Sequence, residues 1–373
     1  MKDLNSSDFS NKRVLMRVDF NVPIRNGVIQ SDTRIKAVIP TIKFLQKRNC
    51  KITLMSHLGR PKGKDLELSL APVALALSKL LNQEVKFAND CINIDFSLEP
   101  SEIILLENTR FYEEDKKNDP EFSKKLANNQ DIFIMEAFAT AHRKNASTYG
   151  IQDHLESYYG LLVNEELTKI NKIIDSKEKP FIAVLGGKKI TDKIDVVKNL
   201  LEIADYVIIG GGMPFPFYSL KGIHTGLSML DAGDWEIIKP FLDHPKLLLP
   251  IDYRVADNTR TSKFENVDFD KIPEDKMALD IGEKSIEKFT KLILSAKKVV
   301  WNGPVGVFEN PAFAVGSKKL GEAISKVPLT LIGGGDTISA IENLNIKKTF
   351  THISTGGGAV LEILKGKQLI ALR

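Results

Sequence analysis

Cysteine is scarce in this chain, and its scarcity argues against two kinds of site. Cys50 and Cys91 are the two cysteines in 373 residues, and they lie far apart without forming a CxxC pair. A disulfide framework or a thiolate metal site is therefore not expected. The six histidines are scattered, without the spacing of a zinc site. We expect both cysteines to be buried and to pack as small hydrophobic residues.

Long apolar runs and a large excess of charge are missing as well. No stretch of about 18 apolar residues occurs, and the first residues lack the apolar segment of a signal peptide. These features predict a cytoplasmic protein without a membrane partner. Lys and Arg number 52 against 48 Asp and Glu, which gives a formal net charge of +4. This charge does not favour nucleic-acid binding, and the basic loop SHLGRPKGK lacks interleaved aromatic residues.

Short apolar runs alternate with amphipathic stretches along the whole chain, which is too long for one hydrophobic core. The expected strands are residues 13–20, 51–57, 102–107, 131–138, 181–185, 206–210, 247–251, 299–301, 329–332 and 350–354. The expected helices include residues 33–48, 70–81 and 162–176. The alternation predicts an α/β fold of two doubly wound, parallel-sheet, Rossmann-like domains joined by a hinge helix. It breaks near residues 150–165, which places the domains at 1–160 and 161–359.

Polar and basic side chains follow the strands of the first half, at the edge where open parallel sheets bind ligands. They are Asp19, Asn21, Arg34, His57, Arg60, Arg110, His142 and Arg143. Any one of them alone could equally be a solvated surface charge. Arg and His side chains at several strand ends favour a site for a small polyanion, because planar guanidinium groups suit carboxylate and phosphate.

Glycine follows the strands of the second half instead, in GGKKITDKI, GGGM, NGPVGVFE, GGGDT and TGGGA. Glycine lets the backbone approach a ligand closely, and the next helix directs its first amides at that ligand. Several such turns predict a nucleotide site, although neither a G-x-G-x-x-G fingerprint nor a P-loop is present. Asp336 in GGGDT is a candidate carboxylate for Mg²⁺, or alternatively the N-cap of the helix that follows.

Taken together, these segments resemble the phosphoglycerate kinase family. The motifs RVDFNVP, DTRIKA, SHLGRPKG, GGKKITDKI, IIGGGM, WNGPVGVFE, GGGDT and HISTGGGA follow that family's order and spacing from about Lys12 to about Leu369. The resemblance implies an enzyme that transfers a phosphoryl group reversibly between 1,3-bisphosphoglycerate and MgADP, giving 3-phosphoglycerate and MgATP, in glycolysis and gluconeogenesis. It also implies a monomer whose C-terminal tail, about residues 360–373, packs back on the first domain.

The resemblance implies roles for individual residues. Those implied to bind phosphoglycerate are Asp19, Asn21, Arg34, His57, Arg60, Arg110, His142 and Arg143. Those implied to bind ATP or ADP are Gly186, Gly187, Lys189, Lys193, Gly211, Leu279, Asn302, Glu309, Gly333, Gly334, Gly335, Asp336, Thr337, Gly356 and Gly357. The implied catalytic residues are Arg34, Lys189 and Lys193, and Asp336 is the implied carboxylate for Mg²⁺.

This set of residues is chemically sufficient for the implied reaction. The phosphoryl acceptor is a carboxylate, which is already deprotonated at neutral pH, so no general base is needed. Cations and Mg²⁺ around the transferred phosphoryl group can supply the catalysis. Because the predicted cations and glycine turns belong to different domains, we expect the domains to close about residues 150–175.

Some questions stay open in the sequence. Lys188, Pro214 and Ala278 depart from the family's pattern near the nucleotide base, which leaves the preference between adenine and guanine open. One alternative function is phosphoryl transfer to another small acid through the same cation cluster, and another is a binding protein without activity. A coupled assay with ATP and 3-phosphoglycerate separates these possibilities.

Overall fold

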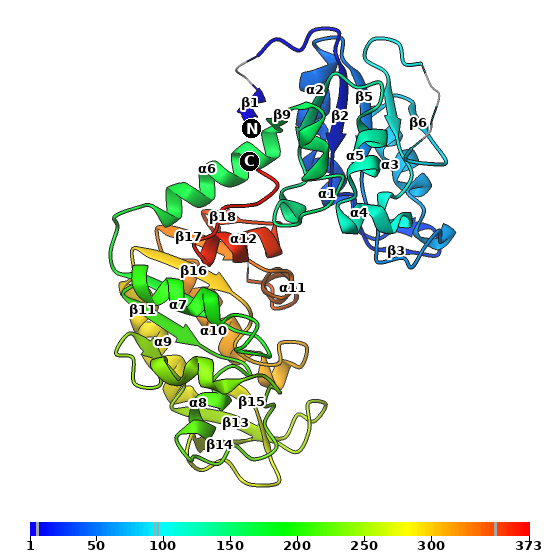
Figure 1. The fold of residues 1–373 in the computed structure, drawn as a ribbon. Helices are drawn as coiled ribbons and strands as arrows, with labels where there is room; N and C mark the ends of the chain where they lie inside the picture. The colour runs from blue at the N-terminus through cyan, green and yellow to red at the C-terminus, as the bar shows by residue number, and fades with distance from the viewer. Residues whose placement is uncertain (5–6, 93, 95–96, 347–348) are drawn as a thin grey trace. The chain divides into compact units, whose positions relative to one another are not determined.

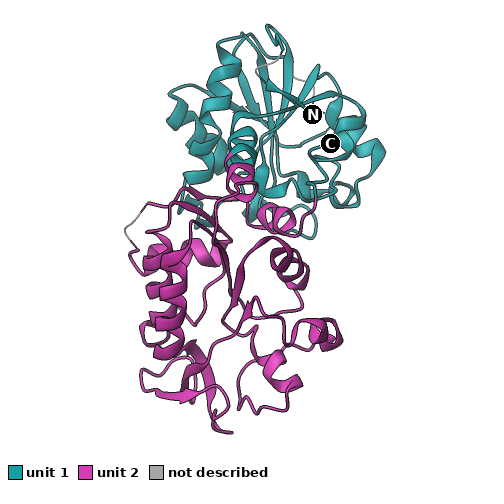
Figure 2. Ribbon diagram, turned by 90° about the vertical axis from the view of Figure 1, so that its left-hand side faces the viewer, with its two compact units in different colours: residues 1–168, 368–373 teal, residues 169–367 magenta. Residues whose placement is uncertain are grey.

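A computed structural model describes residues 1–4, 7–92, 94, 97–346 and 349–373, and the chain divides into two units (Figure 2). Unit 1 comprises Met1–Thr168 and Gln368–Arg373, and unit 2 comprises Lys169–Lys367. The boundary after Thr168 falls inside helix α6 (Leu161–Ile174). Among the described residues, no helix has the length and apolar character needed to cross a membrane.

Unit 1 is built around one parallel sheet with helices on both of its faces (Figure 1). Its strands are β1 (Lys2–Asp3), β2 (Arg13–Arg17), β5 (Lys51–Met55), β6 (Val85–Phe87), β7 (Ile103–Leu105), β8 (Ile132–Met135) and β9 (Glu156–Tyr159), and β3 (Ile24–Arg25) and β4 (Val28–Ile29) form a hairpin. Its helices are α1 (Thr33–Ala37), α2 (Ile39–Gln46), α3 (Ala71–Leu81), α4 (Glu113–Lys117), α5 (Pro120–Ala127) and the first part of α6.

The sheet of unit 1 has the strand order β1-β9-β8-β2-β5-β7-β6, and each neighbouring pair is parallel. From β2 the chain first builds toward β5 and later returns to add β8 on the other side. The order therefore reverses between β2 and β8, and ligands bind beyond the carboxyl ends of strands at such a point. Apolar side chains such as Val14, Ile52 and Ile134 are fully buried in the core that anchors these strands.

Unit 2 contains a second parallel sheet and a smaller antiparallel one. Its strands are β10 (Phe181–Leu185), β11 (Tyr206–Ile209), β12 (Leu247–Leu248), β13 (Asp252–Ala256), β14 (Glu265–Asp268), β15 (Met277–Ile281), β16 (Lys298–Asn302), β17 (Leu329–Gly333) and β18 (His352–Ile353). Its helices are α7 (Ile194–Ile203), α8 (Phe215–Leu220), α9 (Glu283–Ser295), α10 (Val315–Ile324), α11 (Gly335–Asn343) and α12 (Gly357–Leu364).

The parallel sheet of unit 2 has the order β12-β11-β10-β16-β17-β18, so its order reverses between β10 and β16. Helices α7 and α12 contact each other, as do α9 and α10, and the helices cover both faces of the sheet (Figure 1). The smaller sheet has the order β14-β13-β15, and both of its strand pairs are antiparallel. The predicted pair of parallel α/β sheets is therefore confirmed.

The structure differs from the predicted elements in several places. The helix expected at residues 33–48 is two helices, because Pro40 in the first turn of α2 has no N–H with which to continue the ladder of α1. Residues 150–165, where the alternation breaks, contain strand β9 and the start of α6. The antiparallel sheet β14-β13-β15, the β3–β4 hairpin and strands β1 and β6 were not expected.

The chain returns to unit 1 at its end. Ala371 donates its backbone N–H to the carbonyl of Ala141 at 2.9 Å, and the Gln152 side-chain amide donates to the carbonyl of Ala371 at 2.9 Å. The Arg373 guanidinium lies 3.8 Å from the centre of the Tyr149 ring. Residues 368–373 are therefore held against residues 141–152, the segment that contains His142.

Candidate active site

Unit 1 carries a hydrogen-bonded network just beyond the carboxyl end of β2. The Arg34 guanidinium, at the start of α1, forms an ion pair of 2.7 Å with Asp19 and donates to the carbonyl of Asn21 at 3.2 Å. The Asn21 side-chain oxygen in turn accepts the backbone N–H of Gly59 at 2.9 Å. About a third of the Arg34 side chain stays exposed, so Asp19 orients a guanidinium that can still bind an anion.

His57 lies at the centre of the cations that follow the strands. It is buried, and its pKa is held well below the usual value by burial and by the charges of Arg17, Arg110, Arg143 and Arg34. Its Nδ1 accepts a hydrogen bond of 3.1 Å from the guanidinium of Arg17. The imidazole is therefore neutral, and its Nε2 carries the proton and can donate to a ligand.

Arg17 was missed by sequence reasoning. It closes strand β2, it is 2% exposed, and it donates to the Ser147 hydroxyl at 3.2 Å as well as to the carbonyl of Val18. A charged residue inside the otherwise apolar run RVLMRV was the signal available in the sequence. Arg17 fixes the orientation and proton state of His57 from within the sheet.

Three further arginines complete a crowded set of cations. Burial, together with the charges of Arg143 and Arg17, lowers the pKa of Arg110 to about 10, and Arg110 donates to the carbonyl of Gly59 at 2.6 Å. Burial also lowers the pKa of Arg143, and the charge of the exposed Arg60 adds to that effect. Mutual repulsion of this kind is relieved when an anion binds.

His142 completes the set of unit 1 residues predicted from the sequence. It neighbours Arg143 in the chain and accepts a hydrogen bond of 3.3 Å from its Nε. The structure thus links all eight predicted residues of this unit through hydrogen bonds or through neighbouring charges. Arg17 and Ser147 are the additions to that set.

In unit 2 the backbone comes very close to itself where the strand order reverses. A Cβ atom on Gly186, directly after β10, would lie 1.9 Å from the carbonyl oxygen of Pro304, which follows β16. Gly211 has φ of +67°, and a Cβ there would lie 2.5 Å from the carbonyl oxygen of Gly187. These positions accept no side chain without a shift, so glycine is needed for the tight turns.

Lys193 extends beneath this turn. Its ammonium donates to the carbonyl of Gly186 and to the side-chain oxygen of Asn302, both at 2.7 Å. Burial lowers its pKa to about 8, although the charges of Asp336 and Asp192 act in the opposite direction. The side-chain amide nitrogen of Asn302 is buried without a hydrogen-bond partner in the described part of the chain. The side-chain N–H of Asn302 is therefore an available hydrogen-bond donor beside the glycine turn.

The first turns of α11 and α12 lie side by side. A Cβ on Gly357, the first residue of α12, would lie 3.9 Å from the backbone nitrogen of Gly335, the first residue of α11. Thr337 fixes the approach to α11, because its hydroxyl donates to the carbonyl of Gly333 and accepts from the N–H of Gly303, each at 2.7 Å. Two glycine-led helix N-termini form a natural anion site.

Asp336 is the second residue of α11, and Gly334, with φ of +93°, is the N-cap. The alternative interpretation of Asp336 as the N-cap is therefore wrong. Its carboxylate is exposed and forms no hydrogen bond or ion pair with the residues that the structure describes. Within the same residues, no group of three or more His, Cys, Asp or Glu side chains is arranged to hold a metal. Asp336 thus fits a metal ion whose other ligands are phosphate oxygens and water.

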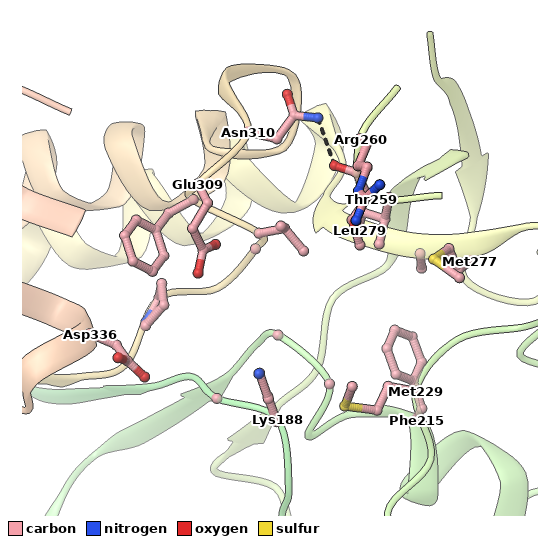
Figure 3. Close-up of a pocket in the computed structure, with 18 of the residues that line it drawn as sticks. Lys188, Phe215, Met229, Thr259, Arg260, Met277, Leu279, Glu309, Asn310 and Asp336 are labelled. Carbon is pink, nitrogen blue, oxygen red and sulfur yellow. Dashed lines mark hydrogen bonds between the residues drawn. The ribbon is translucent and has the colours of Figure 1, made fainter. Parts of the chain in front are cut away.

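A cavity of about 1010 Å³ opens beside these turns (Figure 3). Its apolar lining comes from Phe215, Leu227, Met229, Met277, Ala278 and Leu279, and its charged lining from Lys188, Arg260, Glu309 and Asp336. The loop around Arg260, on one side of the cavity, is fixed by the Asn310 side-chain amide, which donates to the carbonyls of Thr259 and Thr261 at 2.8 Å each. The volume and the mixed lining suit a ligand with one apolar and one charged end.

The residues predicted to bind nucleotide fall into two groups relative to this cavity. Those that line it are Gly187, Gly211, Leu279, Glu309 and Asp336. Those beside it, at the glycine turns and helix N-termini, are Gly186, Lys193, Asn302, Gly333, Gly334, Gly335, Thr337, Gly356 and Gly357. Lys189 is exposed and does not line the cavity, whereas its neighbour Lys188 does. Leu227, Met229 and Arg260 lie in loops without a sequence pattern and were missed.

Comparisons with known proteins agree with one another. The family model described as phosphoglycerate kinase matches residues 1–367. The chain is 46% identical to phosphoglycerate kinase of Dictyoglomus turgidum, with 98% of this chain and 96% of that protein covered, and 44% identical to that of Borreliella afzelii, with 100% and 98% covered. It is also similar to the solved phosphoglycerate kinase structure from Coxiella burnetii, with a TM-score of 0.90, 36% identity, and 99% of this chain and 97% of that chain covered.

Proposed function

The chain belongs to the phosphoglycerate kinase family, and we propose that unit 1 binds the phosphoglycerate and unit 2 the nucleotide. It is an enzyme of glycolysis that transfers a phosphoryl group reversibly between 1,3-bisphosphoglycerate and ADP. The family establishes the reaction. The assignment of residues to the two substrates rests on the geometry of each unit.

The observation that carries the proposal is the crowding of cations around His57. Arg17, Arg34, Arg110 and Arg143 act together on this one buried imidazole. So many like charges are unfavourable without a partner, and a phosphoglycerate supplies both a carboxylate and a phosphate. In this assignment Arg34, Arg60, Arg110, Arg143 and His142 neutralise the ligand, Asp19 and Asn21 orient Arg34 and Gly59, and His57 donates a neutral hydrogen bond.

In unit 2 the proposed nucleotide lies with its base at the apolar end of the cavity and its phosphates toward the glycine turns. Phe215, Met229 and Met277 supply the apolar contacts, and Glu309 is within the cavity to accept from the ribose hydroxyls. The amides at the starts of α11 and α12 receive phosphate oxygens. The mixed apolar and glycine-rich lining supports this orientation over the reverse one.

The proposed catalysis depends on charge neutralisation and not on proton transfer. The acceptor carboxylate is ionised at neutral pH, so the chain needs no base to activate it. Lys193 can exchange its bonds to Gly186 and Asn302 for bonds to a phosphate, while Arg34 stabilises the group in transfer. Lys189, which is exposed, must turn toward the phosphates to act.

The magnesium ion that the family generally uses fits the exposed carboxylate of Asp336. Bound there, the ion would neutralise phosphate charge during transfer. Asp336 would hold it as one ligand, and the nucleotide would supply others. Within the chain, Asp336 also favours the charged form of Lys193, which keeps that ammonium ready for a phosphate.

We also propose that the chain works as a monomer in the cytoplasm and that α6 acts as a hinge when both substrates bind. The family resemblance supports the monomer, and the position of the unit boundary inside α6 supports the hinge. Small-angle scattering on the purified chain tests both points. A dimer mass, or an unchanged radius of gyration with both substrates present, would contradict the corresponding part.

The test of the proposed assignment is a coupled assay with ATP and 3-phosphoglycerate on Arg34→Ala. Loss of one preorganised donor to the transferring group lowers kcat by about 10²- to 10³-fold. Arg25→Ala is the matched control, because Arg25 is an exposed arginine of the β3–β4 hairpin outside the network. Equal activity of the Arg34 and Arg25 variants would refute the role of Arg34. The same assay with GTP in place of ATP decides the base preference.

A further inference from the structure

Lys188 and Lys189 are neighbours in the chain, but only one of them lines the cavity of unit 2. Lys188 belongs to the lining, and Figure 3 shows its ammonium ending in the open middle of the cavity. Its side chain forms no hydrogen bond or ion pair with the residues that the structure describes, and it is exposed. A cation without a partner inside a cavity is available to an anionic ligand.

The position of this ammonium along the cavity indicates which part of a nucleotide it meets. In Figure 3, Asp336 lies to one side of Lys188, and Phe215 and Met229 lie to the other. A nucleotide whose base occupies the apolar end and whose last phosphate lies near Asp336 passes Lys188 with its middle portion. We propose that Lys188 binds the α-phosphate of this nucleotide, an inference that rests on the proposed function of the cavity.

The backbone of Lys188 is fixed, so the direction of its side chain is set by the fold. A Cβ on Gly212 would lie 2.6 Å from the carbonyl oxygen of Lys188, and Gly212 donates its N–H to the carbonyl of Gly187 at 2.8 Å. The turn after β10 is thereby packed against the turn after β11. A long flexible side chain on this rigid base can reach a phosphate without moving the backbone.

The charges of the cavity explain why such a cation is needed. The acidic side chains in its lining are Glu309 and Asp336, which repel an anionic ligand, and the basic ones are Lys188 and Arg260. Lys193 lies under the glycine turn, where its ammonium binds Gly186 and Asn302. In this proposal Lys188 binds the α-phosphate, and Lys193 lies nearer the terminal phosphate.

The experiment compares the dissociation constants of adenosine, AMP and ADP by calorimetry. The variants are Lys188→Met, which keeps an unbranched apolar side chain without the charge, and Lys188→Arg, which keeps the charge. Lys198→Ala is the control, because Lys198 is an exposed lysine of α7 outside the cavity lining. Melting curves verify that each variant is folded.

The proposal predicts that Lys188→Met raises the dissociation constants of AMP and ADP by the same factor, about tenfold. The dissociation constant of adenosine should change by less than about twofold. Lys188→Arg recovers most of the loss, and Lys198→Ala binds as the wild type does. Equal weakening of adenosine and AMP would overturn the proposal, because Lys188 would then contact the base or ribose. Unchanged binding of all three ligands would overturn it too. A wild-type chain that binds none of them would refute the proposed nucleotide cavity itself, and the inference with it.

Discussion

Replacing the buried Arg17 by Met tests whether the cation cluster is organised from inside the sheet. Methionine fills a similar volume but removes the donor to His57 Nδ1, to the Ser147 hydroxyl and to the Val18 carbonyl. Each buried acceptor left without its donor costs about 1–3 kcal/mol, while removing a buried charge offsets part of that loss. We expect a net destabilisation of about 1–3 kcal/mol.

The functional effect should be larger on substrate binding than on turnover. Arg17 contacts His57 and not the transferring group, so KM for 3-phosphoglycerate should rise about tenfold, which corresponds to about 1.4 kcal/mol, while kcat changes less. Arg13→Met is the matched control, because Arg13 begins the same strand and pairs with Asp131 instead of the cluster. A steady-state assay on both variants measures KM and kcat separately.

The pKa of His57 distinguishes positioning from a general structural defect. Burial is the first cause of its lowered pKa and the charge of Arg17 is the next, so the variant's His57 pKa should rise but stay below the usual value. Because the folded pKa is depressed, the unfolded chain binds more protons at acid pH, and stability falls as pH drops below about 6.5. NMR titration of the imidazole measures this pKa. An unchanged value in Arg17→Met would refute the reasoning.

Three further predictions follow from single contacts. Gly160→Ala places a Cβ 1.7 Å from the buried Glu136 Oε2, so it should lower the free energy of unfolding by about 1–3 kcal/mol in thermal melts. Adding Glu136→Asp should recover part of that loss. An unaltered melting curve of Gly160→Ala would contradict this prediction. The pKa of Lys193 is lowered to about 8, so ADP should bind more weakly as pH rises through that value. In Lys193→Arg this pH dependence should vanish, because the guanidinium stays charged. A loss of ADP affinity with rising pH that persists in the variant would assign the effect to another group. Asp336→Asn should raise the Mg²⁺ concentration needed for half-maximal activity in the coupled assay, and EDTA should abolish activity of the wild type; equal Mg²⁺ dependence would remove Asp336 from the metal site.

The strands that the sequence predicted are those whose buried residues form an apolar run in the sequence. β10 and β8 are buried at every position and read as unbroken apolar runs, and β16 is equally buried with the apolar centre VVW. β14, with the sequence ENVD, has no buried residue, and β9 has one. Strand β13 (DYRVA) is buried at every position, but Asp252 and Arg254 interrupt its apolar pattern, so the antiparallel sheet and β9 went unpredicted.

The same limit applies to the candidate site. Residues directly after strands, such as Asp19 and Gly186, follow from the rule that ligands gather at the carboxyl ends of parallel strands. Arg17 lies within a strand, where sequence alone does not tell which face its side chain takes. Arg260 reaches the cavity because Asn310, about fifty residues later in the chain, binds the carbonyls on either side of it. Tertiary contacts of this kind have no local signature.

The return of residues 368–373 to unit 1 has a consequence for biosynthesis. A ribosome finishes all of unit 2 before it makes Ala371, whose N–H binds the Ala141 carbonyl immediately before His142 and Arg143. The loop that carries His142 and Arg143 therefore receives this support only after unit 2 has been translated. A nascent chain halted before Ala371 can fold unit 2 while unit 1 still lacks the hydrogen bond from Ala371 to the Ala141 carbonyl.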